Sequence, residues 1–165
     1  MPLSKNNLKQ AARIYAQGLL METPPGSTDP LDELVEALEL HLRIALHDEE
    51  TRIIWLAIKN NVIKGLLDFF HRSSELVIRF ICAIPPRQGM GSLLLYHLAQ
   101  YGLRHQIELI TATVSSLDVR AQQFYFTHLG FQKVGSRFDE MGLELFLAEV
   151  SPQALIGVIE EINEK

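Results

Sequence analysis

Apolar residues recur along the chain with two different periods, and the change of period separates predicted helices from predicted strands. A period of three to four residues predicts amphipathic helices over residues 4–20, 31–46, 90–105 and 151–165. Runs rich in β-branched and aromatic residues predict strands over residues 52–59, 62–71, 76–84, 108–114, 132–137 and 143–150. One further short helix is predicted from Asp118 to residues 129–131.

Turn and cap residues indicate how these elements connect. Ser4 is the predicted cap of the first helix, with no clear strand before it, and Asn60-Asn61 predict a two-residue hairpin turn. The strand–helix–strand unit of residues 76–114 predicts a right-handed crossover between parallel strands. We therefore expect an α/β fold of the α+β kind, with a mixed central sheet flanked by helices. Without a repeat or a change of composition, residues 1–165 are expected to form a single domain, whose C-terminal helix (residues 151–165) packs on the core or on a partner.

Composition narrows the class of protein. Hydrophobic residues make up 47% and charged residues 21% of the 165 residues, as in ordinary globular proteins. The net charge of −5 argues against binding to nucleic acid, and no apolar stretch is long enough to span a membrane. The single cysteine, Cys82, lies in an apolar run, so we expect it to be buried and inert, in a reducing compartment. A cytoplasmic location is the resulting expectation.

The segment PPRQGMGS (residues 85–92) joins a predicted strand to a predicted helix and is a candidate phosphate site. Pro85 and Pro86 end the strand ladder, and Gly89 and Gly91 allow a tight turn. The following helix places free N–H groups and a partial positive charge at the same point. Two common phosphate motifs are excluded: G-x-x-x-x-G-K-[ST] is absent, and Leu94 stands where a dinucleotide fingerprint needs its third glycine. A plain connecting turn remains the alternative.

A second segment, taken together with the glycine loop, indicates which kind of ligand the loop binds. RQGMGSLLL together with DVRAQQFYFTHLGF (residues 118–131) resembles the acetyl-coenzyme A binding core of the GNAT superfamily of N-acetyltransferases. That family has a [QR]-x-x-G-x-[GA] loop before a long helix and, about thirty residues later, a motif close to N-x-x-A-x-x-[LF]-Y-x-x-x-G-F. The matching residues of the second motif are Ala121, Phe124, Tyr125, Gly130 and Phe131. Two positions depart from the pattern, because Pro86 occupies the Arg/Gln position, with Arg87 one place later, and Asp118 replaces the asparagine.

The resemblance implies a GNAT-like fold that binds acetyl-coenzyme A as co-substrate. Backbone amides of the loop would hold its pyrophosphate, with Arg87 and Ser92 as additional donors. The implied binding residues are Ile84, Arg87, Gln88, Gly89, Met90, Gly91, Ser92, Asp118, Ala121, Phe124 and Tyr125. The six histidines have no metal-ligand spacing, so we expect no metal.

The resemblance also implies a reaction, the direct transfer of an acetyl group to the amine of a small molecule or peptide. Tyr125 matches the tyrosine that protonates the departing thiolate in many family members. Its reference pKa of about 10 exceeds the thiol's, about 8.5, so complete proton transfer is uphill by roughly 2 kcal/mol and the help is partial. A packing role in the core is the alternative for Tyr125.

The acceptor amine needs a base, because deprotonating an amine of pKa about 10.4 at pH 7 costs about 4 to 5 kcal/mol. Asp68, His71 and Glu75 are the candidates, each with a structural role as the competing interpretation, and Asp68 is our choice. Two other functions stay open. One is a non-catalytic acyl-coenzyme A sensor or interaction module on the same fold, and the other is a scaffold that forms a homodimer through its C-terminal helix.

Overall fold

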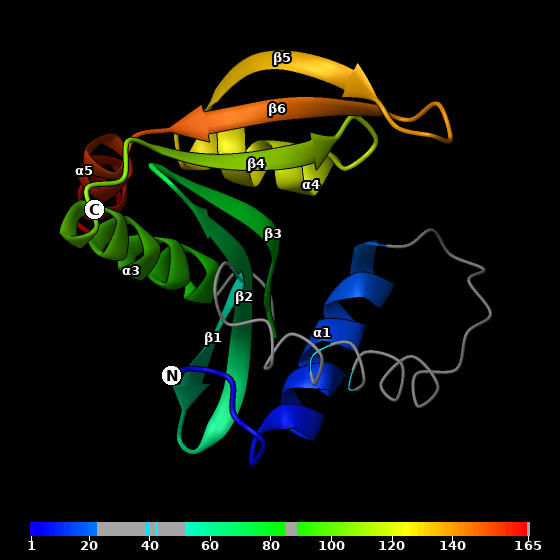
Figure 1. Ribbon diagram of the computed structural model, residues 1–165, viewed down its shortest axis with the longest axis vertical. Helices are drawn as coiled ribbons and strands as arrows, with labels where there is room; N and C mark the ends of the chain where they lie inside the picture. Colours follow the sequence, from blue (N-terminus) through cyan, green and yellow to red (C-terminus); the bar gives the residue numbers. More distant parts are fainter. Residues whose placement is uncertain (23–38, 40–41, 43–51, 85–88, 165) are drawn as a thin grey trace. The chain divides into compact units, whose positions relative to one another are not determined.

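The computed structural model describes residues 1–22, 39, 42, 52–84 and 89–164 (Figure 1). Its elements, in chain order, are α1 (Leu8–Glu22), β1 (Arg52–Lys59), β2 (Val62–Arg72), β3 (Glu75–Ala83), α3 (Met90–Arg104), β4 (Leu109–Ser115), α4 (Val119–Gln122), the π-helix η1 (Gln123–His128), β5 (Gln132–Phe138), β6 (Glu144–Val150) and α5 (Pro152–Asn163). The predicted helix over residues 31–46 lies almost entirely outside the described residues.

The chain divides into two compact units. Unit 1 comprises Met1–Phe70 and Phe80–Leu94, and unit 2 comprises His71–Arg79 and Leu95–Lys165. The strands pair in the order β1-β2-β3-β4-β6-β5, a mixed six-stranded sheet. The predicted α/β fold with a mixed sheet is therefore confirmed, while the prediction of a single domain stays a prediction.

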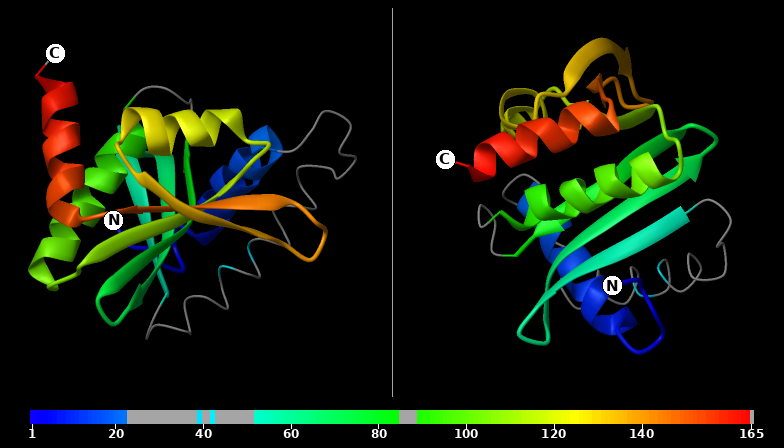
Figure 2. Two further views of the ribbon diagram at one scale, coloured as in Figure 1. Left: turned by 90° about the horizontal axis from the view of Figure 1, so that it is seen from above. Right: turned by 90° about the vertical axis from the view of Figure 1, so that its left-hand side faces the viewer.

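Unit 1 is built on the β1–β2 hairpin. The two strands pair antiparallel, and Asn60 and Asn61 adopt φ values of 54° and 62°, as a tight two-residue turn requires. Helix α1 lies along this part of the sheet (Figures 1 and 2) and packs into its core. The core combines apolar residues of α1, Leu42 and the three strands: Leu8, Ala11, Ala12, Ile14, Tyr15, Ala16, Leu42, Ile54, Leu56, Ile63, Leu66 and Phe80.

The N-terminal residues extend the edge of unit 1. Pro2 forms an isolated antiparallel bridge with Trp55, and Leu3 N donates to Ile54 O at 3.1 Å. Helix α1 begins at Leu8, four residues later than predicted, and Ser4 is not its cap. Instead Ser4 N donates to Asn7 Oδ1 at 2.7 Å, because residues 1–3 are held in extended pairing before the helix starts. A short irregular edge thus stands where the sequence shows no clear first strand.

Unit 2 contains the start of β3, residues 95–104 of α3, and the strands β4, β5 and β6. The start of β3 pairs parallel with β4, as predicted, and β6 lies antiparallel between β4 and β5. Helix α4 contacts β4, and the Ser151 hydroxyl caps α5 by accepting from Ala154 N at 3.2 Å. Leu155 and Ile159, from the apolar stripe predicted for the C-terminal helix, are buried within the chain. A homodimer through this helix stays a prediction.

Candidate functional site

The glycine loop of unit 1 leads directly into α3. Gly89 has φ +80°, a left-handed conformation that glycine adopts without strain, and its carbonyl accepts from Leu93 N at 3.0 Å. Met90, Gly91 and Ser92 therefore form the first helical turn, where backbone N–H groups have no acceptor within the helix. Such a turn suits an anion, because its donors and the helix dipole act at one point. Of the other predicted residues, Ile84 follows the last residue of β3 and is half-buried, and Arg87 and Gln88 lie outside the described residues.

Asp118 of unit 2 caps the second motif. Its Oδ1 accepts from Ala121 N at 3.0 Å, as an N-cap side chain does at the start of a helix. Gln122, which the sequence did not single out, ties the same turn to the end of β4, because its Nε2 donates to Ser115 O and Ser116 O at 3.1 and 3.0 Å. The aspartate that departs from the family pattern thus has a local structural role, and its contact with acetyl-coenzyme A stays a prediction.

Tyr125 lies in a π-helix rather than in the short α-helix that the sequence predicts. In η1 the Leu129 N–H donates to Phe124 O at 3.0 Å, five residues back. The spacing in this segment differs from that of the family motif, which accounts for the π-helix. Four residues separate Tyr125 from Gly130, whereas the quoted motif has three. The match of Gly130 and Phe131 is therefore corrected by one residue, and a π turn can accommodate the extra residue.

The side chain of Tyr125 is 7% exposed and lies among aromatic rings. The ring centroids of Phe124 and Phe131 are each 5.1 Å away, nearly perpendicular to it. Phe124 and Ala121, the other predicted ligand-binding residues on this segment, are half-buried. Packing therefore restricts the orientation of the Tyr125 ring, as both a positioned acid and a core aromatic require.

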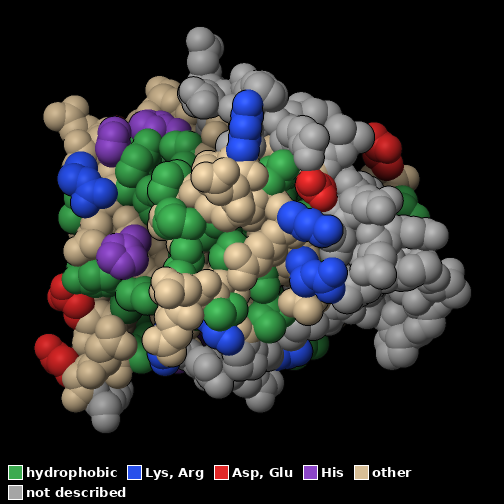
Figure 3. All heavy atoms as spheres, turned by 90° about the horizontal axis from the view of Figure 1, so that it is seen from below, with side chains coloured by type: hydrophobic (Ala, Val, Ile, Leu, Met, Phe, Trp, Pro, Cys, Tyr) green, Lys and Arg blue, Asp and Glu red, His purple; other side chains and the backbone are tan. Residues whose placement is uncertain are grey.

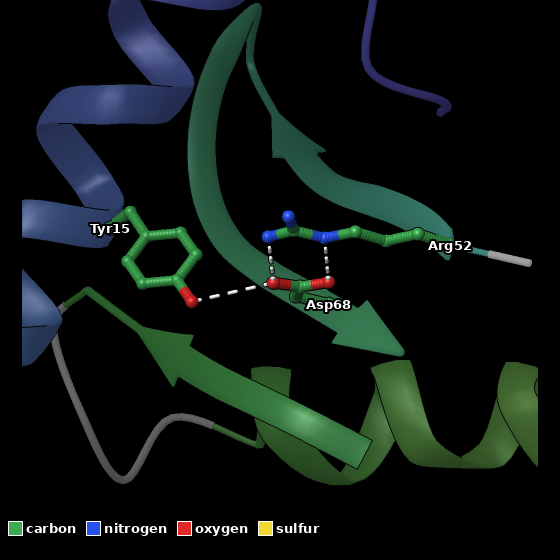
Figure 4. Close-up of polar contacts among 3 residues, drawn as sticks. All are labelled: Tyr15, Arg52 and Asp68. Atoms are coloured by element: carbon green, nitrogen blue, oxygen red, sulfur yellow. Dashed lines mark hydrogen bonds and ion pairs between the residues drawn. The ribbon is translucent and has the colours of Figure 1, made fainter. Parts of the chain in front are cut away.

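Asp68 of unit 1 is fully buried (0% exposed) and paired (Figure 4). Arg52 Nε and Nη2 donate to its two carboxylate oxygens at 3.0 and 2.6 Å, and Tyr15 Oη donates to Oδ2 at 3.3 Å. The hairpin register explains the pair, because Asp68 lies opposite Ile54, two residues from Arg52. A carboxylate whose oxygens are both engaged by a buried guanidinium is better suited to structure than to proton transfer. The role of Asp68 as the base stays a prediction, and its pairing with Arg52 argues against it.

The family of the chain follows from a sequence comparison. Residues 23–151 match the family model described as "Acetyltransferase (GNAT) domain", and this range covers most of the chain. The chain belongs to the GNAT acetyltransferase family. No curated protein matches the sequence at a significant level.

Solved structures with the same fold include GNAT proteins of several bacteria. A candidate GNAT acetyltransferase of Desulfovibrio desulfuricans has a TM-score of 0.70 at 16% identity, over 92% of this chain and 97% of that chain. The ribosomal-protein-S18-alanine N-acetyltransferase of Escherichia coli has a TM-score of 0.65 at 17% identity, over 91% and 90%. A candidate streptothricin acetyltransferase of Bacillus anthracis, in complex with acetyl coenzyme A, has a TM-score of 0.57 at 19% identity, over 63% and 64%. At these identities the likeness is one of fold.

Two further base candidates of this acetyltransferase lie in unit 2. His71 Nδ1 is 2.8 Å from Tyr101 Oη, and the ring of His105 stacks on Tyr101 at 3.9 Å. Burial raises the pKa of Tyr101, and the charge of Arg104 opposes this shift. Glu75 Oε1 accepts from Thr111 Oγ1 at 2.7 Å. Each candidate therefore has a local partner, and no distance here selects one as the base.

The remaining predictions concern surface charge, metal ligands, membrane-spanning helices and Cys82. In Figure 3, Lys and Arg side chains (blue) lie among apolar side chains (green) on the described part of one face. No three His, Cys, Asp or Glu residues among those described form a group that could hold a metal ion. None of the described helices is long and apolar enough to cross a membrane. Cys82 is half-buried rather than buried, with its Sγ 3.6 Å from Ile14 O.

Proposed function

We propose that this acetyltransferase moves the acetyl group of acetyl-coenzyme A directly to an amine of a small molecule or a peptide. The observation that carries the proposal is the glycine turn at the start of α3, inside the segment that matches the GNAT model. Its first-turn amides are the natural donors for a pyrophosphate. Acetyl-coenzyme A occupies the Bacillus anthracis protein of the same fold.

In the proposed reaction the amine nitrogen attacks the thioester carbonyl carbon, the carbon–sulfur bond breaks, and the coenzyme leaves as a thiolate that takes up a proton. The amides of residues 88–92 hold the pyrophosphate, and Arg87 is an additional cation. Tyr125 donates its phenolic proton partially as charge develops on sulfur, which accelerates a reaction by about 10²- to 10⁴-fold for a positioned acid.

The amine must lose its proton before it attacks. Asp68 is a poor acceptor for that proton, because Arg52 holds its carboxylate in a buried ion pair. We therefore propose that the proton leaves to water or through one of the other candidates, His71 or Glu75.

The acceptor class is open between two kinds of amine. Among the proteins of the same fold, one is named for a peptide acceptor, the alanine of ribosomal protein S18, and another for the small molecule streptothricin. An assay of thiol release from acetyl-coenzyme A should therefore include polyamines, aminoglycosides, amino acids and peptides. Release that depends on one class of amine, with the N-acetylated product seen by mass spectrometry, supports the proposal.

The buried Arg52–Asp68 pair also favours a second function, because it leaves no free carboxylate at the position chosen for the base. A non-catalytic sensor of acyl-coenzyme A would need the amide turn and no base. Calorimetric binding of acetyl-coenzyme A without turnover of any amine would support the sensor. Absence of both binding and turnover would contradict both functions.

A further inference from the structure

Two contacts hold the ends of the glycine loop against one dipeptide of β2. Before the loop, Ile84 N donates to Lys64 O at 2.8 Å. After the loop, Leu94, the fifth residue of α3, packs beside the next residue, Gly65. Because Lys64 and Gly65 are adjacent, the strand before the loop and the helix after it are fixed at the same point of unit 1.

The packing around Gly65 is so close that a side chain there would need its neighbours to shift by a few tenths of an ångström. A Cβ on Gly65 would lie 3.1 Å from Cys82 O, 3.2 Å from Leu94 Cδ1 and 3.4 Å from Ala57 Cβ. The first two distances are shorter than ordinary van der Waals contacts, and Cys82 O belongs to the backbone of β3. A side chain at Gly65 would therefore press on Leu94 and on the backbone of β3. Gly89, in contrast, has a positive φ, and a Cβ there would meet nothing within 4 Å.

We infer that Gly65 is a positioning residue for the pyrophosphate of acetyl-coenzyme A. Its missing side chain lets Leu94 seat the first turn of α3 against β2, which sets where the amides of Met90, Gly91 and Ser92 point. A shift of a few tenths of an ångström at Leu94 would be transmitted along the helix to these donors. Charge-assisted hydrogen bonds depend steeply on distance and angle, so binding would weaken. The inference rests on the proposed function.

The principal test is Gly65→Ala, with acetyl-coenzyme A affinity measured by calorimetry and kinetics measured by thiol release. We expect a dissociation constant and a KM raised of the order of tenfold, about 1.4 kcal/mol, with kcat changed less than about twofold. Gly157→Ala is the matched control, because a Cβ at Gly157 of α5 meets nothing within 4 Å. Adding Leu94→Val to Gly65→Ala conserves volume and should recover part of the affinity.

A second readout needs no ligand. Amide hydrogen exchange at residues 93–96, whose N–H groups donate to the carbonyls of the first turn of α3, should be faster in Gly65→Ala and unchanged in Gly157→Ala. If the wild-type protein does not bind acetyl-coenzyme A, the proposed function fails, and the exchange result still decides whether Gly65 positions the turn.

The inference is overturned if Gly65→Ala keeps wild-type affinity and wild-type exchange, or if kcat falls while KM is unchanged. Should Gly65→Ala fail to fold, Leu94→Val loosens the same contact without adding an atom at Gly65. We expect weaker binding and faster exchange in that variant as well. Wild-type affinity and exchange in Leu94→Val would then overturn the inference.

Discussion

Asp68 and Tyr125, the two predicted catalytic residues, are both buried but have different kinds of neighbour. Asp68 is 0% exposed and bound through both oxygens to Arg52. Tyr125 is 7% exposed and packed against the rings of Phe124 and Phe131. A proton arriving on Asp68 would disrupt an ion pair, whereas the rings around Tyr125 hold it in place without a charge. Burial alone therefore does not identify a chemical role, and the partner of the buried group does.

The largest expected effect is on stability, and it tests whether Asp68 has a structural role. Asp68→Ala leaves the Arg52 guanidinium, itself only 7% exposed, without its carboxylate, and should lower the free energy of unfolding by about 3 to 5 kcal/mol. Urea unfolding followed by circular dichroism measures this loss. In the double variant Arg52→Met/Asp68→Leu no charge is left unpaired, so most of the stability should return. A stable Asp68→Ala variant with lost turnover would instead restore the base role.

The variant Tyr125→Phe tests whether the Tyr125 hydroxyl acts as the general acid. The variant keeps the ring that packs on Phe124 and Phe131 and removes only the hydroxyl. We expect kcat to fall by about 10²- to 10⁴-fold while the free energy of unfolding changes by less than about 1.5 kcal/mol. Steady-state thiol release and urea unfolding give the two quantities. Unchanged turnover in the folded variant would assign Tyr125 to the core.

Asp118 should have a smaller effect, which separates capping from ligand binding. Asp118→Ala removes the acceptor of Ala121 N and should cost about 1 kcal/mol of stability. Asp118→Asn restores the family residue and keeps a capping oxygen, so the free energy of unfolding should stay near that of wild type. If Asp118→Asn is as unstable as Asp118→Ala, the capping account is wrong.

The smallest expected effect concerns Tyr101 and pH. Burial raises the pKa of Tyr101 above its reference value of 10.0 in the folded protein. The folded protein therefore favours the neutral form of the Tyr101 phenol more than the unfolded chain does. Its contribution to stability is fully present below pH 10 and is lost as the pH rises through the folded pKa. Urea midpoints measured from pH 9 to 11 should fall less steeply in Tyr101→Phe than in wild type. If the urea midpoints of both proteins fall equally steeply with pH, Tyr101 is not the group responsible for the loss of stability.

Local signals in the sequence were sufficient for much of the fold. The bounds of β1 match the prediction, and Asn60-Asn61 form the predicted hairpin turn. The first edge could not be predicted, because the pairing of residues 1–3 with β1 is too short to have a period. The π-helix was missed for another reason, since α- and π-helices bury similar patterns and one extra residue decides between them.

The candidate site was predicted less completely. The motifs located Gly89 and Asp118 at helix starts, as local chain signals can. The Arg52–Asp68 pair depends on the exact hairpin register, which a bulge at Ala57/Ile58 shifts. The close packing at Gly65 is a contact with Leu94, far along the chain, and a glycine within a strand pattern carries no hint of which helix covers it.

Acetyl transfer to an amine can be tested in a single assay. Purified protein is incubated with acetyl-coenzyme A and the amine panel, and released thiol and N-acetylated product are quantified together. We expect equal amounts of released thiol and N-acetylated product with at least one class of amine. Binding of acetyl-coenzyme A with no N-acetylated product from any amine of the panel would contradict it.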